Sequence, residues 1–309
     1  MKKYFKAIPI SLFTILICYA LGYFSIEYID SYALTIFLFL PSLLGFLPSW
    51  IVLKQKNNSI NVYRLSIYNL IISLLFLLIF AYEGLICIVM AFPILALLTA
   101  IGTYIAKILY KYKFQNKSIG IVIFFSSVLF LSFDSLNKNV TLIPVSTSVV
   151  IQAPIETVWK NVIEFDSIPT PKEFIFKTGI AYPTHANIVG KGENAIRYCN
   201  FTTGSFVEPI THWGAPTLLQ FSVLEQPTPM NELNPFWDIQ PPHLNGYFLS
   251  KKGEFKLSPI NQKETQLTGT TWYEVNVKPE FYWKWWSDFI IHKIHLRVLN
   301  HIKDQSEKI

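Results

Sequence analysis

Residues 145–165 read Val-Ser-Thr-Ser-Val-Val-Ile-Gln-Ala-Pro-Ile-Glu-Thr-Val-Trp-Lys-Asn-Val-Ile-Glu-Phe, and this stretch decides the fold of the second half of the chain. Every second residue up to Ile151 suits a buried position, which predicts a strand with one buried face. Pro154 then suits the first position of a helix, because a proline there loses no helical hydrogen bond. An apolar stripe at helical spacing follows, so a strand should run directly into an amphipathic helix. The predicted strand face consists of Val145, Thr147, Val149 and Ile151, and the helix stripe of Val158, Trp159, Val162 and Ile163.

Six further blocks follow this opening before the end of the chain. They are residues 190–192 (Gly-Lys-Gly), 197–201 (Arg-Tyr-Cys-Asn-Phe), 206–213 (Phe-Val-Glu-Pro-Ile-Thr-His-Trp), 241–246 (Pro-Pro-His-Leu-Asn-Gly), 269–273 (Gly-Thr-Thr-Trp-Tyr) and 282–288 (Tyr-Trp-Lys-Trp-Trp-Ser-Asp). With the opening, they make residues 145–305 resemble the START-like superfamily, also called the polyketide-cyclase or SRPBCC superfamily. Together with its hydrophobic first half, the chain resembles a membrane-anchored bacterial subgroup whose function is largely undefined.

The resemblance implies an α+β fold of the helix-grip type. In such a fold a curved antiparallel sheet surrounds a long C-terminal helix and a cavity for an apolar ligand. We expect two domains, a transmembrane helical domain at 1–143 and a START-like helix-grip domain at 144–309. Members of the superfamily differ in chemistry, so the fold alone names no reaction.

The composition changes near residue 143 and separates two kinds of domain. The whole chain is 51% hydrophobic and 15% charged, which is too apolar for an ordinary soluble protein. Residues 1–143 carry 11 Lys and Arg against 4 Asp and Glu, whereas residues 144–309 carry 15 against 16. The basic excess therefore belongs to the flanks of membrane helices. We expect no nucleic-acid partner, because the second half has no basic stripe interleaved with aromatic residues.

Five apolar stretches in the first half are candidates for membrane spans, since about 20 mostly apolar residues cross a bilayer. Residues 65–109 are too long for one span and must hold two, with a tight turn at Tyr82-Glu83-Gly84. That turn keeps the Glu83 carboxylate at the interface, because a charge in the hydrocarbon core is costly. A cleaved signal peptide is the alternative for the first stretch, but no small-x-small cleavage site follows it. The expected spans are about 7–26, 33–53, 65–82, 84–109 and 118–134.

The charges of the connecting loops predict the orientation. Basic residues mark the N-terminus and the second and fourth loops, whereas the first and third loops carry only acidic residues. The positive-inside rule then places Met1 in the cytoplasm and, after five spans, Ile309 outside, in a multi-pass protein of the inner (cytoplasmic) membrane. If the short fifth stretch does not cross the membrane, the C-terminal domain lies in the cytoplasm. The basic residues are Lys2, Lys3, Lys6, Lys54, Lys56, Arg64, Lys107, Lys111, Lys113 and Lys117, and the acidic ones are Glu27, Asp30 and Glu83.

The second half is predicted to be a meander of short strands between clusters of Gly, Pro and Asn. Residues 226–245 contain five prolines and form a long irregular connection. Such a loop inside a compact domain is usually functional, and here we expect a lid over the cavity. The expected strands lie near 193–201, 206–213, 217–225, 246–257 and 265–277, and the last helix at about 280–303.

The hairpin at 194–213 brings Arg197 near Glu208. If residues 202–205 form a four-residue turn, the two side chains lie diagonally on one face and are close enough to meet. One interpretation is a structural ion pair that locks the hairpin. The other is a ligand site in which Arg197 holds an anionic head group, with Glu208 orienting it.

The last helix carries the densest polar cluster. Asp288, His292 and His295 share one face, because they follow i, i+4, i+7 spacing. Trp285 lies one turn earlier and Leu299 one turn later. Since the resemblance implies that this helix closes the cavity, we expect the cluster to be structural or to orient a ligand. We predict no metal, because one helix rarely supplies three ligands with good geometry. The polar residues beyond the cluster, expected to face solvent, are His301 and Lys303.

His243 follows two prolines in the expected lid and is a further site candidate. No nucleophile elbow, phosphate-binding loop, dinucleotide motif or zinc-protease motif occurs in the sequence. We therefore predict no cofactor and leave enzymatic activity open. The candidate ligand-binding residues are Arg197, Glu208, His243, Trp272, Trp285, Asp288, His292 and His295.

Three functions compete. The leading hypothesis is a membrane-tethered binding module whose partners are the bilayer and a hydrophobic small molecule or lipid. The first alternative is a cyclase- or hydrolase-like enzyme with an acid–base pair from Asp288 and His292, or with His243. A cavity that holds histidine and carboxylate of perturbed pKa would favour it, and a wholly apolar cavity would favour binding. The second alternative is a structural partner in a membrane complex, which predicts an exposed aromatic patch in place of a cavity. The sequence identifies no protein partner.

Overall fold

The computed structural model describes residues 7–29, 32–55, 60–136 and 141–308, and the chain forms two compact units. The first unit comprises Met1–Asn139, Leu233–Pro241 and Asn276–Glu280. The second comprises Val140–Glu232, Pro242–Val275 and Phe281–Ile309. Two short segments from the second half of the sequence therefore belong to the helical unit.

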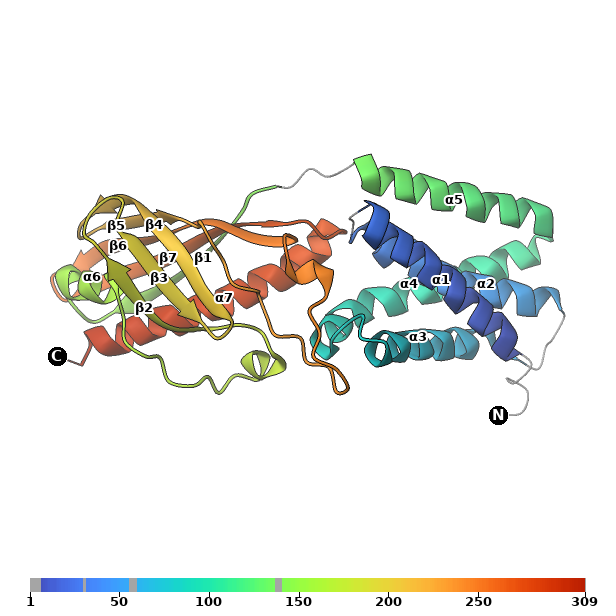
Figure 1. The fold of residues 1–309 in the computed structure, drawn as a ribbon, viewed down its shortest axis with the longest axis horizontal. Coiled ribbons are helices and arrows are strands. Elements are labelled where there is room, and N and C mark those ends of the chain that lie inside the picture. Colours follow the sequence, from blue (N-terminus) through green and yellow to red (C-terminus); the bar gives the residue numbers. More distant parts are fainter. Residues whose placement is uncertain (1–6, 30–31, 56–59, 137–140, 309) are drawn as a thin grey trace. The chain divides into compact units, whose positions relative to one another are not determined.

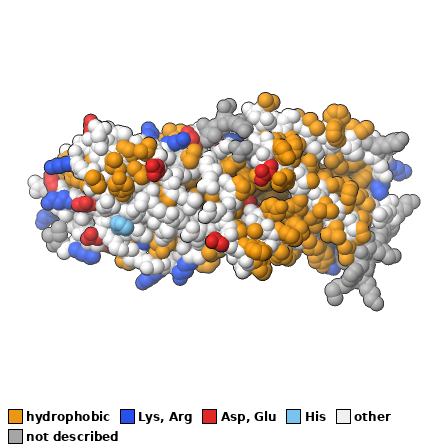
Figure 2. Space-filling view, viewed as in Figure 1, with side chains coloured by type: hydrophobic (Ala, Val, Ile, Leu, Met, Phe, Trp, Pro, Cys, Tyr) orange, Lys and Arg blue, Asp and Glu red, His pale blue; other side chains and the backbone are white. Residues whose placement is uncertain are grey.

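The first unit is built of helices that suit a membrane. Among the described residues, five helices are long and apolar enough to cross a bilayer, so the five predicted apolar helices are present. Hydrophobic side chains cover most of the face of this unit that Figure 2 shows, as lipid-facing helices require. The elements are α1 (Ile8–Ile29), the π-helix η2 (Thr35–Phe39), α2 (Leu40–Lys54), α3 (Val62–Ile79), α4 (Leu85–Lys111) and α5 (Asn116–Leu136), with η2 and α2 forming one span.

Glycines let α2 and α4 pack closely. A Cβ atom on Gly45 would lie 1.9 Å from the carbonyl oxygen of Thr99, and one on Gly102 would lie 1.9 Å from that of Ser42. No larger residue fits at either position without moving a backbone. Small residues at helix contacts are typical of proteins in lipid, where close backbone packing drives association.

The tight turn between the third and fourth spans is present. α3 ends at Ile79 and α4 begins at Leu85, so residues 80–84 separate the two helices and include the predicted turn at 82–84. Gly84 caps α4 in an extended conformation.

A buried carboxylate joins the end of α5 to the start of the second span. The side chain of Asp134 accepts hydrogen bonds from the amides of Leu34 and Thr35, at 3.1 and 2.8 Å. The first amides of a helix have no intrahelical partner and carry partial positive charge. They therefore compensate a carboxylate that would otherwise be costly to bury.

The second unit contains a seven-stranded antiparallel sheet and the long helix α7 (Figure 1). The first strand pairs with the last, and the others form a meander, in the order β1-β7-β6-β5-β4-β3-β2. α7 packs its buried residues Val298, Leu299 and Ile302 into the same core as the sheet, so the predicted architecture of an antiparallel sheet around a long C-terminal helix is confirmed. The strands are β1 (Ile143–Ile151), β2 (Pro183–Val189), β3 (Ile196–Phe201), β4 (Gly204–Gly214), β5 (Leu218–Ser222), β6 (Phe248–Asn261) and β7 (Glu264–Val275), and the helices are α6 (Ile155–Ile163), η3 (Phe174–Thr178), η4 (Pro242–Leu244) and α7 (Glu280–Ser306).

The opening stretch forms the predicted strand and helix, with two differences: Pro154 precedes the first helical position, and Ile163 of the predicted stripe is only partly buried. In β1 the buried side chains are Ile143, Thr147 and Ile151, which lie on one face. The helix α6 begins directly after Pro154, which caps it. Its buried stripe consists of Val158, Trp159 and Val162.

Strand β2 is not predicted by the sequence pattern. It is an edge strand, with a register irregularity between Pro183 and His185. Only Pro183 and Ala186 are buried in it. An edge strand that begins with proline and buries so few side chains lacks a clear apolar alternation.

The β3–β4 hairpin corrects the predicted register. Phe201 pairs with Gly204, so the turn has two residues rather than four. Two-residue turns are the commonest hairpin connections. Arg197 therefore lies directly opposite Glu208 instead of diagonally. Because the shift is two residues, both side chains keep their predicted face.

Candidate functional site

A cavity of about 150 Å³ lies between the sheet and α7 within the second unit. Most of its wall is apolar, formed by aromatic side chains of the sheet and aliphatic side chains of the helix. The apolar members include Phe201, Phe206, Phe221, Phe248, Phe255, Ile290, Ile291, Ile294, Val298 and Leu299, and the ionisable members are Arg197, Cys199, Glu208, Lys252, Glu254 and His295.

Arg197 lies in this wall and is only 1% exposed. Its Nη1 donates to Oε2 of the facing Glu208, and its Nε donates to the carbonyl oxygen of Ile163 at the end of α6, at 3.2 Å. Burial is the largest influence and disfavours the Arg197 cation, but the attraction and hydrogen bonding of Glu208 and Cys199 together exceed it, so the pKa of Arg197 is raised. Burial likewise raises the pKa of Glu208, against the attraction of the guanidinium. The predicted pair is thus formed and almost fully buried.

Three aromatic rings surround this guanidinium. The ring centroids of Phe165, Phe221 and Phe255 lie 5.6, 5.6 and 5.4 Å from its Cζ. A cation within about 6 Å of a ring face is attracted by it. Gly253 makes room for one ring, because a Cβ atom there would lie 2.5 Å from the Cζ atom of Phe221. The glycine on β6 therefore allows the ring to lie over the buried charge.

His295 on α7 is the second polar group of the wall, and two threonines of the sheet hold it. Its Nε2 lies 2.8 Å from Oγ1 of Thr271, and its Nδ1 lies 3.1 Å from Oγ1 of Thr147. The same Thr147 oxygen lies 2.8 Å from Nδ1 of His292. Burial, and then the neighbouring His292, lowers the pKa of His295 to about 4. The imidazole is therefore neutral near pH 7, and its one donor and one acceptor suit two hydroxyl partners.

Asp288 and His292 do not line this cavity. They border a shallow open groove beside Trp285, which is 61% exposed. Asp288 accepts a hydrogen bond from Tyr273 at 2.7 Å and pairs with Lys284, while His292 bonds Thr147. Among the described side chains, the expected acid–base pair of Asp288 and His292 is thus not formed. The predicted helix face is therefore divided between two sites, since His295 lines the cavity whereas Asp288 and His292 border the groove. Asp288 and His295 are seven residues apart, which is about 10 Å along the helix axis.

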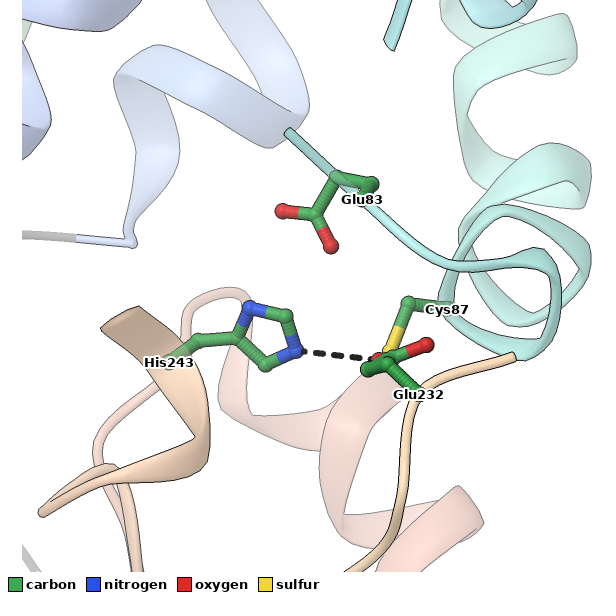
Figure 3. A group of neighbouring side chains, drawn as sticks. All are labelled: Glu83, Cys87, Glu232 and His243. Atoms are coloured by element: carbon green, nitrogen blue, oxygen red, sulfur yellow. Dashed lines mark ion pairs between the residues drawn. The ribbon is translucent and has the colours of Figure 1, made fainter. Parts of the chain in front are cut away.

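His243 and Trp272 also lie away from the cavity wall. Nε2 of His243, on η4, lies 3.5 Å from Oε1 of Glu232, the contact drawn as a dashed line in Figure 3. The pair joins the two sides of residues 233–241 within the long loop. Trp272 on β7 points away from the face of Thr271, because side chains alternate along a strand. Its ring lies 4.5 Å from Nζ of Lys252.

The expected lid contributes only its first residues to the cavity. Gln226, Pro227, Thr228 and Pro229 line the wall, whereas Leu233–Pro241 belongs to the first unit.

The prediction that His301 faces solvent is wrong. It is 6% exposed, and its ring lies 5.8 Å from that of Phe165, edge to face. Burial lowers the pKa of its imidazole. The helix turns this residue toward the segment after α6, which the spacing within α7 alone does not reveal.

The inner wall suits an uncharged ligand. Arg197 and Glu208 compensate each other, and both ring nitrogens of His295 have hydroxyl partners. An anionic head group bound at Arg197 would have to displace Glu208 and leave it buried without its partner, which is costly. An apolar molecule leaves all these interactions intact.

No protein-family model and no curated protein sequence matches the chain. Solved structures similar to it include norcoclaurine synthase of Thalictrum flavum, at 13% identity, with 55% of this chain and 97% of that chain covered and a TM-score of 0.36. The ZhuI aromatase/cyclase of Streptomyces sp. R1128 matches at 11% identity over 54% of this chain and 95% of that chain, with a TM-score of 0.35. The protein XoxI of Bacillus cereus matches at 12% identity over 53% and 96%, with a TM-score of 0.35. The likeness is one of fold and carries no argument about ligand or reaction.

Proposed function

We propose that the protein is a membrane-tethered binding module for an uncharged, hydrophobic small molecule or a segment of a lipid. The observation that carries the proposal is the apolar cavity whose only buried charges pair with each other. Ligand pockets are mostly apolar, with a few placed polar groups. Here Arg197 and His295 are such groups, and each is fixed by its own partners.

The volume of the cavity limits the size of the group that it accepts. At about 150 Å³ it lies below the usual range of about 300–1,000 Å³ for ligand pockets. An engineered apolar cavity of about this size binds benzene. The ligand group is therefore a single ring or a short acyl segment, unless the wall moves.

Binding is tested by the thermal stability of the full chain in detergent. A molecule that binds only the folded state raises stability, by about 2.7 kcal/mol at a concentration 100 times its dissociation constant. Benzene and toluene should raise the melting temperature of the wild type and leave that of Ile294→Trp, which fills the cavity, unchanged. Ile260→Trp, at a 52% exposed site on β6, is the matched control and should respond like the wild type. Equal responses of all three variants would contradict binding in this cavity.

The orientation that we propose has the N-terminus in the cytoplasm and the C-terminal unit outside. Within the first unit, the amide of Lys278 donates to the carbonyl of Tyr32, between the first two spans, at 3.0 Å. The amide of Leu85, after the third span, donates to the carbonyl of Leu233 at 2.8 Å. If the five helices cross the membrane one after another, the loop after the first span, the loop after the third span and the end of the fifth span all lie on the same side. This agreement supports an odd number of spans. Residues of the charge argument that lie outside the described ranges are Lys2, Lys3, Lys6, Asp30 and Lys56.

Reporter fusions test this orientation. Alkaline phosphatase fused after Ile309 should be active, and a fluorescent protein that matures only in the cytoplasm should stay dark. Fluorescence without phosphatase activity would contradict the proposal.

A second candidate is an enzyme that uses acid–base chemistry. His295, with a pKa lowered to about 4, and Glu208, with a raised pKa, line the same cavity. Perturbed pKa values gather at functional sites, although structural pairs show them too. A binding module releases the same compound from wild type and His295→Gln. An enzyme would release product from the wild type and unconverted substrate from the variant.

A further inference from the structure

The loop between β5 and β6 has two parts with different attachments. Its first part forms cavity wall and is bonded to the sheet. The side chain of Gln226 donates to the carbonyl of Phe248 and accepts from the amide of Ser250, both at 2.8 Å. The carbonyl of Pro229 accepts from the amide of Ala181 at 3.0 Å. Residues 226–229 are thus an ordered part of the wall.

The second part of the loop, Leu233–Pro241, is called the tip here and belongs to the first unit. Besides the bond from the Leu85 amide to Leu233, the side chain of Asn234 donates to the carbonyls of Leu78 and Glu83, at 2.9 and 3.2 Å. Nε1 of Trp237 donates to the carbonyl of Ile79 at 2.7 Å. The last carbonyls and first amides of helices lack intrahelical partners. The tip supplies such partners to the end of α3 and the start of α4.

The two parts are joined by a short and ordered link. Met230 bridges to Ile180, and the amide of Asn231 donates to the carbonyl of Gly179 at 2.8 Å. Glu232, the last residue before the tip, faces His243, which follows the tip. Four peptide links separate Pro229 from Leu233 and reach at most about 14 Å when extended. A link so short has little slack to absorb movement of the tip.

We propose that the tip is a tether by which the α3–α4 end of the transmembrane unit holds the cavity wall at 226–229 closed. The proposal rests on the proposed function, since it concerns access to the same cavity. Opening the wall then requires that the tip leave the helix ends or that the helices move with it. Access to the cavity is therefore governed by the membrane helices as well as by the ligand.

Cys199 provides a readout of opening, because it lines the cavity and is 7% exposed. The other cysteines, Cys18 and Cys87, are replaced by Ala, which leaves Cys199 as the single thiol of the full chain in detergent. The double substitution Asn234→Ala/Trp237→Phe removes the three side-chain bonds from the tip to the helix ends, and also the bond that Oδ1 of Asn234 accepts from the amide of Phe236 within the tip. Maleimide should then label Cys199 about tenfold faster or more, since three hydrogen bonds to helix ends are lost.

Phe236→Ala is the matched control, because this tip side chain is 62% exposed and no hydrogen bond of the tip uses it. It should leave the labelling rate unchanged. A rate that is the same in the double variant and the control would overturn the tether. Failure of the proposed function gives a different result: benzene would then not slow the maleimide labelling of Cys199 in the double variant or in the control.

Hydrogen exchange on the unmodified chain tests the tether without any variant. The amides of Leu85 and Ala181 bond to carbonyls on the two sides of the link, Leu233 and Pro229. If the tip and the wall open together, the two amides exchange with the same opening rate. Fast exchange at Ala181 with lasting protection at Leu85 would mean that the wall opens alone, and the tether would be rejected.

Discussion

The Arg197–Glu208 pair and the Thr147–His295–Thr271 cluster lie in the wall of one cavity but differ in charge and in origin. The first is an ion pair between neighbouring strands, enclosed by three aromatic rings. The second is a neutral imidazole on α7 that is hydrogen-bonded to hydroxyl groups of the strands β1 and β7. A guanidinium stays charged at any ordinary pH and needs a carboxylate, whereas an imidazole can give up its proton and be satisfied by neutral partners.

The largest effect is expected where the charge balance is broken. Arg197→Ala leaves Glu208 buried without its partner and should lower the free energy of unfolding by about 3–5 kcal/mol. Replacing both residues by apolar ones, as in Arg197→Met/Glu208→Leu, should cost much less, because no charge is left unpaired. The free energy of unfolding of both variants is measured by urea unfolding, with labelling of Cys199 as the readout in the chain that has Ala at positions 18 and 87. An unchanged midpoint in Arg197→Ala would show that the pair contributes nothing.

The second effect is a pH dependence that belongs to the neutral cluster. Between about pH 4 and pH 6.5 the unfolded His295 imidazole binds a proton that the folded one does not. The free energy of unfolding therefore rises with pH in this window and falls on acidification, by at most about 1.4 kcal/mol per pH unit. His295→Gln should remove this part of the slope. His185→Gln, at an exposed site, serves as the control and should keep it.

A smaller effect is expected at the glycine beside the ion pair. In Gly253→Ala the new methyl group would overlap the Phe221 ring, and the ring would have to leave its place over Arg197. Overpacking of this kind typically costs about 1–3 kcal/mol. Gly269→Ala on β7, where a Cβ atom would meet its nearest neighbour at 3.5 Å, controls for the loss of backbone freedom. If Gly253→Ala is as stable as the wild type, the close approach of the ring is not required.

The smallest effect is expected at the exposed end of the cluster. His292 lies in the open groove, and among the described residues its hydrogen-bond partner is Thr147, so His292→Leu should change the free energy of unfolding by less than about 0.5 kcal/mol. Without the His292 imidazole, Thr147 is hydrogen-bonded to His295 alone. The variant should therefore change the amount of bound ligand more than it changes the free energy of unfolding. An unfolded His292→Leu variant in which no ligand is ever detected would show that the cluster is only structural.

Features that depend on local spacing were predictable from the sequence. The alternation up to Ile151 and the stripe after Pro154 predict β1 and α6, and the length of the apolar stretches predicts the five helices. The Arg197–Glu208 pair was predictable because both residues lie in one hairpin. A register error of two residues does not change their face.

Features that depend on long-range partners were not predictable. Thr147 and Thr271 lie more than 120 residues apart, and nothing in their own strands marks them as partners of His295. The capping of α3 by the side chains of Asn234 and Trp237 likewise joins segments about 150 residues apart. The prolines of this loop indicated an irregular connection but not its attachment to the helices.

The most direct measurement is native mass spectrometry of the full chain released from detergent, with the co-purified compound identified after denaturation. We expect an uncharged apolar compound on the wild type and on Ile260→Trp, and none on Ile294→Trp. A wild type that carries no compound after purification from its own membrane and binds no apolar probe, or an Ile294→Trp variant that carries the same compound as the wild type, would contradict a ligand cavity between the sheet and α7.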